Sequence, residues 1–62
     1  MKKDWEIIVD HLDAEADRIS TTAKFQVVFG DSLTAKALFI AADAVNDLSN
    51  KIKDVMGASG NA

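Results

Sequence analysis

The chain has 62 residues, so we expect one domain at most, and a domain of about 60 residues buries only ~60% of the surface that its unfolded form exposes. It contains no cysteine, which excludes disulfides, and its single histidine argues against a structural zinc site. The net charge of -3 provides no overall positive field for nucleic acid or for an anionic membrane. Because the apolar fraction is 48%, oligomerisation is the expected source of further stability.

We expect no targeting signal in the N-terminal residues. Lys2 and Lys3 are followed by Asp4 and Glu6, and the apolar run over residues 7–9 is too short for the core of a signal peptide. No segment approaches the roughly 20 apolar residues that span a bilayer. We therefore expect a soluble, cytoplasmic protein with no membrane partner.

The first predicted element is a helix over about residues 4–29. Asp4 is a suitable N-cap, and apolar residues at steps of three and four form one stripe along the segment. The stripe comprises Trp5, Ile8 or Val9, Leu12, Ala16, Ile19 and Ala23. Residues 24–29 are rich in β-formers, which leaves open a strand that would pair between chains. A helix is favoured there because no partner strand follows in the chain.

A turn is predicted over residues 30–32, since Gly30 can adopt the left-handed conformation that ends a helix. Asp31 or Ser32 can then cap the second helix. That helix is expected over about residues 33–56, with a flexible tail over 57–62 after Gly57. Its seam steps by three and four through Leu38, Ala41, Val45, Leu48, Ile52 and Val55.

The first half of the second helix is apolar over a much wider arc than one seam requires, which is typical of a buried helix. A single hairpin covers only one face of each helix, so the remaining arc should contact another chain. The expected fold is all-α: a helical hairpin of two antiparallel helices that assembles into a homodimeric four-helix bundle. The predicted self-association or partner interface comprises Ala37, Leu38, Phe39, Ile40, Ala41, Ala44, Val45 and Leu48.

Residues 10–17 contain four of the acids and the only histidine, and they are the densest set of candidate ligands. Di-iron bundles use a Glu-x-x-His pattern, which this chain lacks, and these acids flank the apolar stripe instead of interrupting it. A solvated acidic face explains them better than a metal site. Because His11 is the only imidazole and no thiol exists, we expect no catalytic residues, no cofactor and no enzyme activity.

The plan of the whole chain resembles the Rop family of plasmid copy-number regulators, in length, acidity, the tight turn near Gly30 and the glycine-containing tail. That resemblance implies an antiparallel four-helix homodimer that binds paired RNA loops through the first helix of each subunit. Lys3 matches the family's pattern on that helix. The positions that carry asparagine, phenylalanine, glutamine and a later lysine in the family hold Asp10, Ala14, Arg18 and Phe25 here.

Two functions follow as expectations. The first is a noncatalytic homo-oligomer that acts through protein–protein contacts as a regulator, inhibitor or assembly factor. Apolar residues near the turn favour it, namely Phe25, Val28, Phe29, Phe39 and Ile40. The alternative is an RNA-binding regulator of the Rop type, for which Lys3, Arg18 and Lys24 are the candidate nucleic-acid contacts.

Overall fold

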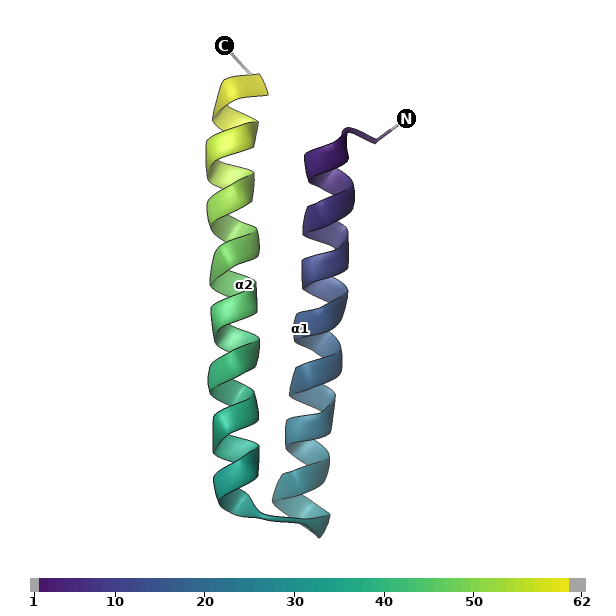
Figure 1. Cartoon of the computed structure of the whole chain (residues 1–62), viewed down its shortest axis with the longest axis vertical. Coiled ribbons are helices and arrows are strands. Elements are labelled where there is room, and N and C mark those ends of the chain that lie inside the picture. Colours follow the sequence, from purple (N-terminus) through teal and green to yellow (C-terminus); the bar gives the residue numbers. More distant parts are fainter. Residues whose placement is uncertain (1, 61–62) are drawn as a thin grey trace.

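The computed structural model describes the backbone of residues 2–60 and the side chains of residues 2–57. It contains two helices, α1 (Asp4–Phe29) and α2 (Ser32–Gly60), which lie antiparallel and side by side, with the C-terminal end of α2 extending beyond the start of α1 (Figure 1). The hairpin measures 48 × 19 × 10 Å. The start of α1 and the end of α2 lie at one end of the hairpin, here called the open end, and the turn lies at the other. The predicted all-α helical hairpin is confirmed.

Helix α1 begins one residue after its N-cap, which is Lys3 and not Asp4 as the sequence predicts. The Lys3 carbonyl accepts hydrogen bonds from the amides of Glu6 and Ile7, at 3.0 and 3.2 Å. Asp4 is instead the first helical residue, where its negative charge interacts favourably with the positive end of the helix dipole. The helix continues without a break to Phe29, so residues 24–29 are helical and not a strand.

Gly30 closes α1 with φ -133° and ψ -140°, so the predicted left-handed conformation is wrong. Its small size serves a different purpose. The side chain of Gln26 occupies the space of a Cβ at Gly30, and its Oε1 accepts a hydrogen bond from the Asp31 amide at 3.3 Å. The Gln26 side chain thus lies over the backbone of Gly30, where there is no Cβ to exclude it, and its hydrogen bond to Asp31 supports the turn.

Asp31 is the N-cap of α2, one of the two candidates that the sequence offers. Its Oδ1 accepts a hydrogen bond from the Leu33 amide at 3.0 Å, and its Oδ2 accepts one from the Thr34 hydroxyl at 3.1 Å. Helix α2 then runs to Gly60, so the predicted end near residue 56 and the predicted tail over 57–60 are corrected. Gly57 weakens a helix but does not block it, and no proline follows. Residues 61–62 of the predicted tail lie outside the described residues.

Small side chains form the contact between the two helices. Val9 and Ala23 of α1 and Ala35 and Ala42 of α2 are buried, and Ser49 is fully buried. Leu38, Val45 and Ile52 are half-buried beside them. Small residues at alternate levels allow two helices to approach closely while larger neighbours fill the flanks.

The seam that faces α1 is rotated relative to the predicted one. Leu38, Val45 and Ile52 belong to both seams, but their partners in the structure are Ala35, Ala42 and Ser49. The other three predicted seam residues are exposed: Ala41, Leu48 and Val55. A wide apolar arc offers two overlapping seams, and the hairpin covers only one of them.

Candidate interaction surface

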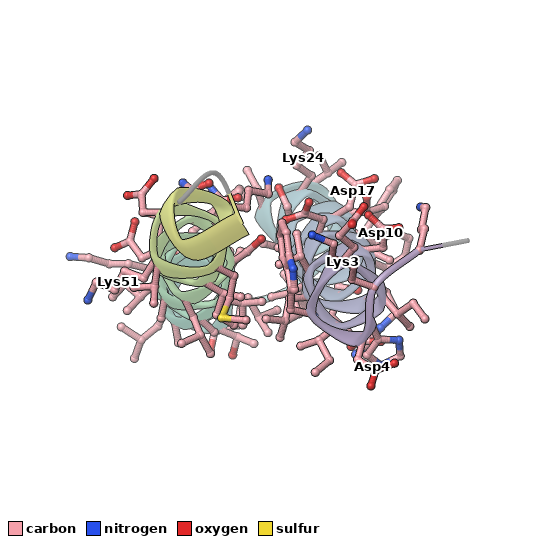
Figure 2. The ribbon with its side chains drawn as sticks, turned by 90° about the horizontal axis from the view of Figure 1, so that it is seen from above. Lys3, Asp4, Asp10, Asp17, Lys24 and Lys51 are labelled. Carbon is pink, nitrogen blue, oxygen red and sulfur yellow. The ribbon has the colours of Figure 1, made fainter. Side chains whose placement is uncertain are left out.

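The hairpin has two unlike sides, and one of them is polar. There α1 and α2 enclose a shallow groove of about 540 Å³ whose polar lining includes Asp13, Asp17, Ser20, Asp43 and Asn46. Figure 2 shows Lys3, Asp10, Asp17 and Lys24 along the same side of α1, at intervals of seven residues. We call this side the polar face.

One polar pair joins the two helices beside this groove. The fully buried Ser49 hydroxyl donates a hydrogen bond to Asp13 Oδ1 at 2.7 Å, and Lys53 Nζ lies 3.4 Å from Asp13 Oδ2. The Ser49 hydrogen bond, followed by the nearby Lys53 ammonium, holds the pKa of Asp13 below its ordinary value against the opposing effect of desolvation. Asp13 thus anchors α1 against α2 at one defined register.

The sequence places Asp13 only on a predicted solvated acidic face and does not predict its hydrogen bond to Ser49. A signal for it does exist in the sequence. Asp13 and Ser49 lie at equal distances of eighteen residues from Asp31, and an antiparallel hairpin with its turn at that residue places them opposite each other. A small polar residue at Ser49, in heptad register with Ala35 and Ala42, is the second part of the signal.

The opposite side of the hairpin is apolar. At about 100° per residue, Ile8 and Ile19 of α1 and Ala41, Leu48 and Val55 of α2 all lie on the side turned away from the polar groove. Ile8, Leu48 and Val55 are 52%, 50% and 64% exposed. We call these five residues, with the half-buried Leu12 and Ile52 beneath them, the apolar face.

The apolar face deepens at the open end of the hairpin. A groove of about 360 Å³ is lined there by Trp5 of α1 and by Lys51, Ile52, Val55 and Met56 of α2. Only apolar atoms line its surface, because Lys51 contributes its aliphatic stem. Figure 2 shows Lys51 directed away from α1, at the outer side of α2. Both the face and its groove are suited to apolar side chains and not to a polar ligand.

The eight predicted interface residues of α2 are divided among three directions. Ala37, Ala41, Ala44 and Leu48 lie on or beside the apolar face, and Ile40, 63% exposed, lies further round the same flank. Leu38 and Val45 are half-buried toward α1. Phe39 points to the polar side and is 36% exposed. Sequence periodicity identified the apolar arc but not the part of it that α1 covers.

The three candidate nucleic-acid contacts are not gathered into one patch. Lys3 and Lys24 share the polar face but are separated by about 30 Å of helix, with Asp10 and Asp17 between them (Figure 2). Arg18 lies on another side of α1, where its Nη2 contacts Glu15 Oε2 at 2.7 Å. This ion pair raises the pKa of Arg18 and lowers that of Glu15.

Three of the four acids of residues 10–17 also have structural partners. Lys2 pairs with Asp10, Arg18 with Glu15, and Ser49 and Lys53 with Asp13. Among the described residues, no group of three or more His, Cys, Asp or Glu side chains is placed to hold a metal ion. Neither of the two helices that the structure describes is long and apolar enough to cross a membrane.

Comparison of the chain with protein-family models, curated proteins and solved structures finds no match.

Proposed function

We propose that the protein is a noncatalytic homodimer, a four-helix bundle that acts through protein–protein contacts as a small regulator, inhibitor or assembly factor. The observation that carries this proposal is the apolar face. It runs along both helices and includes large side chains that are half or more exposed. Contiguous apolar surface of this kind is uncommon on proteins that work alone and is typical of an association site.

The exposed area of the hairpin supports the same proposal. A compact monomer of 6.7 kDa is expected to expose about 3,900 Å², whereas this chain exposes 4652 Å². The excess of roughly 700 Å² is close to the ~800 Å² that each partner buries in a standard protein–protein interface. Packing the apolar faces of two hairpins together would bring each chain to the exposure of an ordinary folded protein.

The polar face is unsuited to the same contact between two antiparallel copies of α1. Its charges read Lys3, Asp10, Asp17, Lys24, so an antiparallel pairing in register sets lysine opposite lysine and aspartate opposite aspartate. Like charges placed opposite each other are destabilising. Self-association is therefore directed to the apolar face.

The proposed interface is tested with two variants, each of which adds one carboxylate to a different side of α2. In a lone hairpin Ala41 is exposed, so Ala41→Asp would be tolerated. In the proposed dimer it places an unpaired carboxylate inside the interface, at a cost of several kcal/mol, and the dimer should dissociate. Asn50→Asp, an exposed position on the polar side of α2, adds the same charge and should leave the mass unchanged.

Sedimentation equilibrium of the two variants at one concentration compares them directly. Dissociation of the Ala41→Asp variant, with the Asn50→Asp variant still dimeric, supports the apolar face as the interface. Equal masses and equal melting temperatures for both variants would refute it.

RNA binding of the Rop type is the second candidate, and the observation in its favour is that Lys3 and Lys24 share one side of α1. Asp10 and Asp17 between them oppose phosphate binding. We expect structured RNA to bind the wild type no more tightly than it binds the Lys3→Ala/Lys24→Ala variant at 50 mM salt. Salt-dependent binding that the double variant loses, with the dimer intact, would reverse the order of the two candidates.

A further inference from the structure

The groove at the open end of the apolar face is incomplete within one hairpin. Trp5 and Ile52 in its lining are half-buried, but Val55 and Met56 are 64% and 38% exposed. An apolar lining offers water no hydrogen bond, so covering this surface with an apolar side chain is favourable. That side chain has to come from a second molecule, because both helices already contribute to the lining.

Phe29 can supply the missing side chain. It is 75% exposed, the most of any large apolar side chain that the structure describes. It ends a row of α1 residues at intervals of seven: Ile8, Glu15, Thr22 and Phe29. Residues at such intervals keep one direction in the hairpin, since Val9 and Ala23, fourteen residues apart, are both buried. Phe29 thus extends the apolar face to the turn, within about 60° of Ile8 on an ideal helix.

Helix α2 carries a matching row on the apolar face, again at intervals of seven: Thr34, Ala41, Leu48 and Val55. The two residues nearer the turn are small, and the two nearer the open end are large and at least half exposed. Helices pack closely when large side chains of one lie against small side chains of the other. Two copies of this row are therefore complementary when they run in opposite directions.

A dimer with its turns at opposite ends brings Phe29 to the groove. When two apolar faces meet about a two-fold axis in this way, α1 lies on α1 and α2 lies on α2. Full overlap of the two α1 helices, each Asp4–Phe29, sets Phe29 one residue from the level of Trp5 of the second copy. Leu48 then lies about 3 Å along the axis from the level of Ala41 of the second copy.

Charges on α1 fit the same arrangement. Glu15 is the only carboxylate of the α1 row, and it is paired with Arg18 at 2.7 Å. Full overlap sets Glu15 level with Arg18 of the second copy, so the two ion pairs meet with opposite charges level. With the turns at the same end, α1 would lie on α2, and Glu15 would face Leu48.

The distribution of charge along the hairpin favours opposite ends as well. Residues 17–45, the turn half, carry three bases and three acids, whereas the rest of the chain carries four bases and seven acids. A dimer with both turns at one end sets two acidic halves side by side, and its two grooves face each other without a side chain to fill them. Turns at opposite ends set each acidic half against a neutral one.

We propose that the open-end groove docks Phe29 of a second copy of this chain, in a dimer whose two turns lie at opposite ends. This inference rests on the proposed function and adds the contact that orients the two copies. Each dimer holds two such sites, with Phe29 of one chain against Trp5 of the other. The Phe25 ring, whose centroid lies 4.9 Å from that of Phe29, already restricts the Phe29 ring, which lowers the entropy cost of docking.

The orientation is tested by the distance between two spin labels, one on each chain. The chain has no cysteine, so Lys36→Cys, an exposed position near the turn, takes a single label. Docking sets Lys36 level with Val55 of the second copy, which separates the labels by about 28 Å along the axis. Asn46→Cys, exposed near the middle of α2, is the matched control, because its two labels are level within about 2 Å. The Lys36→Cys distance should exceed the Asn46→Cys distance by roughly 10 Å or more.

The docked ring is tested by Phe29→Ser, with Val28→Ser as its control. Val28 is 70% exposed but lies about 200° round α1 from Ile8, away from the apolar face. Phe29→Ser should weaken the dimer by about tenfold or more, since buried aromatic contacts dominate interfaces, whereas Val28→Ser should leave its Kd unchanged. Trp5 is the only tryptophan. Its emission should shift to longer wavelength in Phe29→Ser at concentrations where that variant is still dimeric.

The outcomes separate docking from dimer formation. Equal label distances at the two positions would place both turns at one end and overturn the docking, with the proposed dimer intact. Equal Kd values for Phe29→Ser and Val28→Ser, or an unchanged Trp5 emission in Phe29→Ser, would also overturn the docking alone. A wild type that stays a single chain at every concentration would contradict the proposed dimer and the docking together.

Discussion

At the scale of single residues, Asp13 connects the chemistry of the chain to its register. Its carboxylate accepts a hydrogen bond from the hydroxyl of the fully buried Ser49 and lies beside Lys53. One side chain of α1 therefore contacts two residues of α2 that are one turn apart. Acid should weaken this connection. A carboxylate whose pKa is lower in the folded state than in the unfolded state stabilises the fold above its unfolded pKa, and the stabilisation is lost as pH falls through the folded value.

The first prediction concerns that pH dependence. Asp13→Asn keeps an oxygen to accept the Ser49 hydroxyl but cannot titrate, so the urea midpoint of the variant should fall less between pH 7 and pH 2.5 than that of the wild type. Glu15→Gln is a useful comparison, because Arg18 lowers the pKa of Glu15 within α1 alone. If the urea midpoint of Asp13→Asn fell as much between pH 7 and pH 2.5 as that of the wild type, Asp13 would not couple protonation to folding.

A second prediction concerns Ser49 itself. Ser49→Ala fits the same buried space and removes only the donor, which should cost about 1 kcal/mol of unfolding free energy. The pKa of Asp13, followed by carboxyl NMR, should rise toward its ordinary value, because the hydrogen bond is the largest cause of the shift. An unchanged pKa in this variant would contradict the assignment.

At the scale of elements, the turn shows how far the sequence alone can predict local structure. The turn at Gly30, a choice of Asp31 or Ser32 as the cap of α2, and the bounds of α1 at 4 and 29 follow from residue types. The conformation of Gly30 does not, because it depends on the side chain of Gln26 folding back from the preceding turn. The covered seam of α2 is missed for a related reason. A wide apolar arc is compatible with several rotations of the helix, and contacts such as Asp13 with Ser49 select one of them.

The prediction at this scale concerns the cap of α2. Asp31→Ala removes the acceptors of the Leu33 amide and the Thr34 hydroxyl, and should lower the unfolding free energy by about 1 kcal/mol. Asp31→Asn retains a capping oxygen and should lose only a fraction of that. Equal stability of all three proteins in urea titrations would mean that Asp31 does not cap the helix in solution.

At the scale of the whole molecule, the hairpin divides its surface into regions with different tasks. The polar face carries charges, the apolar face exposes large side chains of both helices, and Phe25, Val28 and Phe29 form a second exposed apolar surface near the turn. The fold class and the apolar arc were predictable from periodicity. The division of that arc between α1 and solvent depends on the packing of two helices in three dimensions.

The most direct test of the central claim is native mass spectrometry of the wild-type protein, purified gently from cells. The account predicts an assembly of two chains that persists at micromolar concentration, because each hairpin alone leaves Ile8, Leu48 and Val55 exposed. A species of one chain at every concentration would contradict it. The apolar face would then have to be covered by a different protein.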